Sequence, residues 1–129
     1  NYALALAAID SLAEARRVAD GALTLLPGSA AAIRARVWPE LRAGDTATAR
    51  ALLSRYFPTV TDDAGAVALG TAFGSLLDKP TLRRLLAVDA AAIGADRGEW
   101  ALNQAYLRMY LGERDAVMAW ADTARRLLA

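Results

Sequence analysis

Acidic side chains occur in close pairs at three places in this 129-residue chain. The pairs are Asp62/Asp63, Asp96/Glu99 and Glu113/Asp115. Two neighbouring carboxylates can act as a general acid and a general base. Each pair, however, lies at the predicted start of a helix, where the helix dipole stabilises negative charge by about 0.3–1 kcal/mol. Helix capping therefore accounts for these pairs without any catalytic role.

Most other catalytic chemistry is excluded by residue types that the chain lacks. It has no His and no Cys, which removes imidazole bases, thiol nucleophiles and the usual zinc ligands. Gly65, Gly70 and Gly74 follow no predicted strand and do not form a phosphate-binding loop. We therefore predict that the chain is not an enzyme. We also predict no catalytic residue, no cofactor site and no metal site.

Charge and hydropathy argue against nucleic-acid and membrane partners. The chain has 15 basic and 14 acidic residues, a balance that offers no attractive surface to a polyanion. Its longest uncharged run, residues 64–77, is shorter than the roughly 18 residues that a membrane span requires. We expect this run to form a buried helix, and we expect neither nucleic acid nor a membrane as partner.

Helical spacing of apolar residues dominates the sequence. Ala, the best helix former, makes up about a quarter of the residues, and no segment has the alternating pattern of a strand. The spacing predicts about seven helices in an all-α fold of antiparallel hairpins. Seven are expected near residues 12–26, 30–43, 46–56, 64–77 and 81–93 and in a final helical pair that turns at Gly112. Residues 2–9 are expected to belong to a further helix, whose start is frayed or lies outside the chain. Pro39 is expected to kink or break its helix near Trp38.

The hairpins recur at a regular interval. Gly44 and Gly112 are both predicted to end helices, and they lie 112 − 44 = 68 residues apart, which is twice 34. Asp78, at the midpoint, falls in another predicted turn. A helix–turn–helix period of 34 residues is typical of tetratricopeptide repeats.

Three segments resemble parts of that family's repeat. Residues 44–50 resemble the turn and the early second helix, residues 102–108 resemble the first helix, and residues 25–30 resemble the end of a repeat. The chain departs from the family pattern at Asn103, at Asp78 in place of a turn glycine, at Pro39, and at two extra residues before Gly112. The resemblance implies one helical-repeat domain, an α-solenoid with hairpin units of about 1–28, 29–60, 61–95 and 96–129. A compact helical bundle is the alternative.

In tetratricopeptide proteins the first helix of each hairpin lines a concave groove, which implies a partner-binding face here. On the final hairpin, Gln104 and Arg108 lie one turn apart beside small residues. On the opposite face is an apolar stripe that is expected to be buried, formed by Trp100, Leu102, Tyr106, Met109 and Tyr110. This small and polar face is the predicted site for a peptide or its carboxylate. Arg34, Arg42 and Asn103 are the other partner-binding candidates, although Asn103 could instead satisfy a neighbouring backbone group.

Three hypotheses about function follow. We favour a protein–protein interaction scaffold that binds a peptide or partner domain on its first-helix face. The alternative is a regulatory, sensor or dimerisation segment of a larger bacterial signalling or transcription-regulatory protein, with homo-oligomers as one possible form. An enzyme is the remote third. Because the chain starts without Met and stops within a helical pattern, we expect it to be an excised fragment or a matured piece of a larger protein. We expect a cytoplasmic location.

Overall fold

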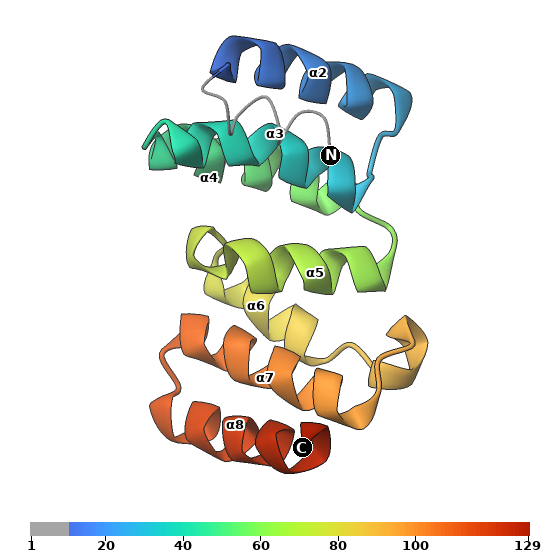
Figure 1. Ribbon diagram of the computed structural model, residues 1–129, viewed down its shortest axis with the longest axis vertical. Helices are drawn as coiled ribbons and strands as arrows, with labels where there is room; N and C mark the ends of the chain where they lie inside the picture. Colours follow the sequence, from blue (N-terminus) through green and yellow to red (C-terminus); the bar gives the residue numbers. More distant parts are fainter. Residues whose placement is uncertain (1–10) are drawn as a thin grey trace. The chain divides into compact units, whose positions relative to one another are not determined.

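The computed structural model describes residues 11–129, and the helix predicted at residues 2–9 lies outside this range. Within the described range the chain is all-helical, with seven α-helices and no strand, which confirms the predicted fold class (Figure 1). The α-helices are α2 (Leu12–Leu25), α3 (Ala30–Arg42), α4 (Thr46–Tyr56), α5 (Asp63–Phe73), α6 (Lys79–Leu86), α7 (Arg97–Leu111) and α8 (Arg114–Leu128). Short 3-10 helices follow α4, α5 and α6, namely η1 (Phe57–Thr59), η2 (Gly74–Leu76) and η3 (Ala90–Ile93).

The helices start at regular intervals along the chain. Alternate helices α3, α5 and α7 begin at residues 30, 63 and 97, so the intervals are 63 − 30 = 33 and 97 − 63 = 34 residues. Helices α4, α6 and α8 begin at residues 46, 79 and 114, which gives intervals of 33 and 35. The interval expected from Gly44 and Gly112 therefore recurs in the helix starts between them.

Two turns have the same hydrogen-bonded geometry at positions 68 residues apart. Gly44 and Gly112 both adopt left-handed backbone conformations, with φ of 77° and 76°. The residue after each glycine donates its backbone N–H to the carbonyl five residues back, Asp45 to Glu40 at 2.9 Å and Glu113 to Arg108 at 3.1 Å. These bonds satisfy carbonyls at the helix end, and the left-handed position favours glycine. At Asp78 there is no such turn, and its side chain caps α6 instead by accepting the N–H of Thr81 at 2.8 Å.

The chain divides into two compact units, residues 1–65 and 66–129, which are described separately. In the described part of the first unit, α3 packs against both α2 and α4. Small and branched side chains fill its core: Ala15, Ala19, Leu23, Ala32, Ile33, Ala35, Val37, Ala49 and Leu53.

Helix α3 continues through Pro39, so of the two effects predicted near Trp38, a kink or a break, the break does not occur. Pro39 lies in the last turn of the helix, where its missing N–H removes the hydrogen bond that a residue at this position would donate to the carbonyl of Ala35. Its ring is fully buried, and its carbonyl accepts the N–H of Ala43 at 3.0 Å. Burial of the ring and the hydrogen bonds that follow it offset the missing N–H of Pro39.

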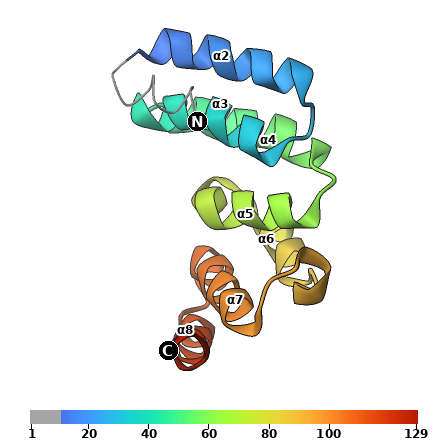
Figure 2. The same cartoon turned by 45° about the vertical axis from the view of Figure 1, so that its right-hand side comes forward.

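In the second unit α7 packs against α6 and η2 on one side and against α8 on the other. Helices α7 and α8 lie side by side and antiparallel in both ribbon views (Figure 1 and Figure 2). A Cβ on Gly70 would overlap Leu85, and one on Gly74 would overlap the ring of Tyr110. Neighbouring side chains therefore approach the backbone closely at these two glycines.

The predicted helices at 64–77 and 81–93 are each divided into an α-helix and a 3-10 helix. At the first division, Phe73 leaves the helical conformation and η2 begins at Gly74. The neighbouring Tyr110 donates its hydroxyl to the carbonyl of Thr71 at 3.0 Å, and burial raises the pKa of this phenol. The second division follows α6, where the side chain of Asp89 caps η3 by accepting the N–H of Ala91 at 3.1 Å.

Candidate functional site

The face of α7 predicted to receive a peptide is packed inside the second unit. Gln104 is only 4% exposed, and its neighbours Ala101 and Ala105 are also buried. The Gln104 amide donates from Nε2 to the carbonyl of Leu86 in α6, at 3.2 Å. The prediction that this face is open to solvent was therefore wrong. The structure instead uses Gln104 to join α7 to α6.

Arg108, one turn after Gln104, contacts groups within the same unit. Its Nη1 donates to Oε2 of Glu113 at 3.3 Å, and its guanidinium lies 5.9 Å from the ring centroid of Trp120. The first contact ties α7 to the turn after it, and the second ties α7 to α8. Arg108 therefore stabilises the hairpin, and its side chain is only partly accessible to a partner.

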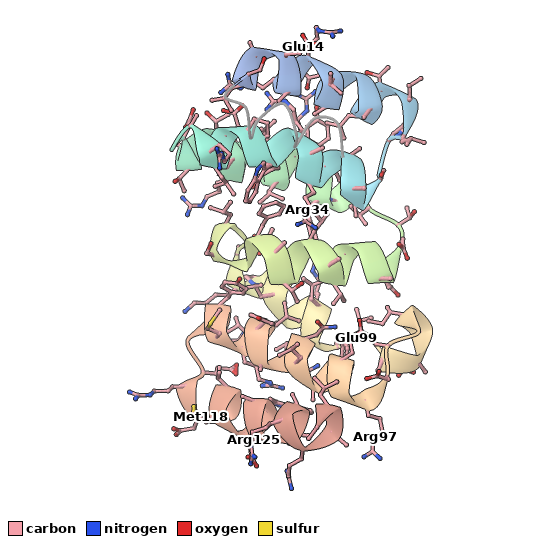
Figure 3. The ribbon with its side chains drawn as sticks, in the orientation of Figure 1. Glu14, Arg34, Arg97, Glu99, Met118 and Arg125 are labelled. Carbon is pink, nitrogen blue, oxygen red and sulfur yellow. The ribbon has the colours of Figure 1, made fainter. Side chains whose placement is uncertain are left out.

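The three remaining candidates are placed differently. Arg34 and Arg42 are exposed on α3 in the first unit, as expected for residues that could meet a partner. Arg34 is labelled in Figure 3. Asn103 is half-buried on α7. Gln104 and Arg108 thus share one buried face of α7, whereas the two candidates on α3 belong to another compact unit. Binding by Arg34, Arg42 and Asn103 stays a prediction.

Large apolar side chains occupy the exposed face of α7. Leu102, Tyr106 and Met109 are 39%, 43% and 49% exposed, and their spacing of four and three residues places them along one side of the helix. The sequence pattern predicted burial for this stripe. The interior face is formed instead by smaller or polar residues together with Leu107 and Leu111.

The stripe continues onto α8 through a hollow beside the α7–α8 turn. The hollow has a volume of about 200 Å³ and is lined by Met109, Gly112, Arg114, Val117 and Met118. Met118 is 67% exposed and lies towards the turn end of α8 (Figure 3). We call the set Leu102, Tyr106, Met109, Val117 and Met118 the hairpin patch. It joins both helices of one hairpin and ends in a hollow of the size of a side chain.

Charged groups at the turn leave one unpaired cation at the hollow. Glu113 is flanked by two arginines, Arg108 at 3.3 Å and Arg83 at 3.7 Å. Arg114 lines the hollow, is exposed, and its side chain has no ion-pair or hydrogen-bond partner within residues 11–129. Asp115 follows it on α8, but adjacent helical residues point about 100° apart, and Asp115 is not part of the hollow. The hollow is therefore apolar with a positive edge.

The most buried charge in the described chain, in the first unit, is structural. Glu40 is only 3% exposed and accepts hydrogen bonds from Arg16 Nε at 2.6 Å, Arg16 Nη2 at 3.2 Å and Arg36 Nη1 at 2.8 Å. Arg36 also donates from Nε to Asp20 at 2.9 Å. The hydrogen bond from Arg16 is the main reason that the pKa of the Glu40 carboxyl lies below its ordinary value, with Arg36 adding to it. This network joins α2 to α3.

Two kinds of feature are absent from residues 11–129. This part of the chain contains no group of three or more acidic residues placed to hold a metal ion. None of its helices combines the length and the hydropathy needed to cross a membrane.

The sequence did not predict that the residues of the hairpin patch lie at the surface. It assigned Leu102, Tyr106 and Met109 to the core because their spacing is that of a buried stripe. The sequence signal that could have shown the buried face was a second stripe, of Ala101 and Ala105, whose small side chains permit the closest helix packing.

In comparisons with known proteins, no family model matches the chain, and no curated protein or solved structure is significantly similar to it.

Proposed function

We propose that the chain is a protein-interaction module of the tetratricopeptide-like type, and that it binds its partner through the hairpin patch on α7 and α8. One observation carries the proposal, namely the exposure of Leu102, Tyr106, Met109 and Met118 on a single hairpin, beside an apolar hollow. Contiguous exposed apolar side chains are characteristic of interaction sites. The proposed site thus stays on α7, the predicted first helix of this hairpin, but it lies on the opposite face, with the apolar stripe in place of Gln104 and Arg108.

The residue types of the patch suit a helical or extended protein segment. Tyr106 offers a rigid aromatic surface of the kind enriched among residues that dominate binding energy. Met109 and Met118 have flexible, polarisable side chains that adapt to different apolar partners. From Leu102 to Met109 the stripe spans seven residues, or about 10 Å along the helix. A partner helix would cover it with anchors from about two turns.

The size of the hollow favours a side chain over a small-molecule ligand. At about 200 Å³ it is smaller than the roughly 300–1,000 Å³ typical of cofactor and metabolite sites. It also lies at the edge of the stripe, where an inserted side chain can belong to a segment that covers the stripe itself. This comparison of volumes favours the interaction module over a sensor of small ligands.

Site-specific photocrosslinking in the protein's native cells tests the proposal. A photoreactive residue at position 118 is expected to capture a specific protein, and an added Met109→Glu substitution is expected to abolish that capture. Position 25 provides a matched control, because Leu25 is exposed but lies on α2 in the first unit. Equal crosslinking from positions 118 and 25, or capture that Met109→Glu leaves unchanged, would contradict the proposal.

The same experiment distinguishes self-association. If the protein captured from position 118 is a second copy of this chain, the patch is a dimerisation surface. Sedimentation of the purified chain then has to show a dimer that Met118→Glu converts to monomer. A chain that stays monomeric at all concentrations would exclude that alternative function.

A further inference from the structure

We infer that the partner segment is an amphipathic helix whose apolar anchor enters the hollow and whose acidic residue pairs with Arg114. The inference rests on the proposed function and specifies the chemistry of the occupant. Charge complementarity at the hollow carries it. Of the five lining residues, Arg114 alone is charged, and the other four present carbon, sulfur and backbone atoms.

Arg114 is available to a partner because no group in residues 11–129 neutralises it. Of its two acidic neighbours in sequence, Glu113 is already opposed by Arg83 and Arg108, and Asp115 does not line the hollow. On α8, Arg114 shares a face with Val117 and Met118, which lie three and four residues further on. A single approaching segment can therefore contact the apolar floor of the hollow and the guanidinium together.

The geometry of the patch selects a helix rather than an extended strand. The exposed residues of α7 recur at intervals of four and three, and such a row offers a continuous apolar stripe along the axis of α7. An amphipathic helix presents a matching stripe at i, i+4 and i+7, which is the usual mode of helix recognition by an apolar groove. A strand would need unpaired backbone groups at a sheet edge, and the described chain contains no strand.

The positive edge then fixes which helix binds. A carboxylate one turn from the buried anchor reaches Arg114, whereas an ammonium or guanidinium at that position is repelled by it. Electrostatic complementarity of this kind mainly raises the association rate and rejects partners of the wrong charge. The contribution must fall at high salt, because the pair is exposed and screened.

A display experiment on the full chain tests the inference directly. The probe is a library of helical peptides of about 14 residues, or roughly four turns. Leu is fixed at three positions with i, i+4 and i+7 spacing, and the flanking positions vary among Glu, Gln and Lys. The inference predicts that selected peptides carry Glu one turn from an anchoring Leu. Arg114→Glu is then expected to weaken their binding about threefold to tenfold at low salt, since a weak exposed attraction becomes a repulsion.

Arg97→Glu is the matched control. Arg97 and Arg114 are each the first residue of a helix, both are exposed, and neither side chain is paired within the described residues. A glutamate is well tolerated at either position because it complements the helix dipole. Arg97 lies at the opposite end of the hairpin from Met118 (Figure 3), so its reversal is expected to leave peptide affinity unchanged.

The outcomes separate the two proposals. If no peptide binds the native chain more tightly than it binds Met118→Glu, the hairpin patch is not the binding surface and the proposed function is overturned. If peptides bind the patch without a preference for Glu, or if Arg114→Glu and Arg97→Glu behave alike, the function stands and the acidic-helix inference is overturned. Selection of Lys beside the anchor overturns the inference equally.

Discussion

Replacing Glu40 by Gln is the sharpest test of how the first unit is held together. The Glu40 carboxylate is 3% exposed and accepts three hydrogen bonds from Arg16 and Arg36. Removing one partner of a buried ion pair typically costs about 3–5 kcal/mol, because the other charge stays buried without compensation. Gln keeps the shape and can still accept a hydrogen bond, so we expect a loss of about 2–3 kcal/mol.

This loss is large against the stability of an ordinary domain, about 5–15 kcal/mol. It corresponds to a drop in melting temperature on the order of 10–20 °C for a unit of this size. Amide hydrogen exchange measured by NMR resolves the effect by region. Protection is expected to fall in α2 and α3, whereas α7 and α8 keep their native protection.

Glu14→Gln supplies the control, because Glu14 on α2 pairs with Arg17 at an exposed position. Solvent screens that pair, and we expect no measurable change in hydrogen exchange. The reasoning is refuted if Glu40→Gln and Glu14→Gln have the same effect. It is also refuted if Glu40→Gln lowers protection in α7 as much as in α3.

Further predictions concern pH, the buried amide and helix packing. The pKa of Glu40 is lower in the folded chain than in the unfolded chain. Its contribution to the free energy of unfolding is therefore complete above the unfolded pKa of about 4.3 and is lost as pH falls through the lower folded pKa. In urea titrations, the unfolding free energies of the native chain and of Glu40→Gln are expected to converge in acid. Gln104→Met is expected to change the free energy of unfolding by less than about 1.5 kcal/mol and to leave crosslinking from position 118 intact. Gln104→Ala is expected to cost about 2 kcal/mol or more because it leaves a cavity, and thermal unfolding measures both changes. Gly74→Ala is expected to lower the free energy of unfolding by about 1–3 kcal/mol, because the added methyl group meets the Tyr110 ring. Gly21 lies inside α2 with open space around it, so Gly21→Ala is expected to raise the free energy of unfolding by about 0.5–1 kcal/mol in the same assay.

Helix type and position could be predicted from the sequence because the local signals were strong. Gly44 and Gly112 end helices through left-handed backbone, and the side chain of Asp78 begins one by capping it. Each of these effects is set by a few neighbouring residues. Local chemistry of this kind is sufficient to divide an Ala-rich chain into helices, and it located the main turns.

The orientation of α7 about its own axis could not be predicted in the same way. Both of its faces contain apolar residues, so hydropathy alone favours burial of the larger side chains of Leu102 and Tyr106. The structure buries the face with Ala101 and Ala105 instead. Small side chains let neighbouring helices approach closely, and that gain depends on the partner helix rather than on α7 itself. The candidate site was therefore assigned to the wrong side of the correct helix.

The two matching helix ends carry opposite charges, and this difference protects the chain against exchanging its repeats during folding. Glu40 and Arg108 occupy the same place, because each accepts the backbone N–H that follows a left-handed glycine turn. A chain that packed α7 against α2 in the place of α3 would bring the guanidinium of Arg108 towards Arg16, where Glu40 lies in the native unit. Two like charges close together in a partly buried position repel each other. Similar helical units thus remain distinguishable to one another, since only the native pairing gives Arg16 the carboxylate of Glu40.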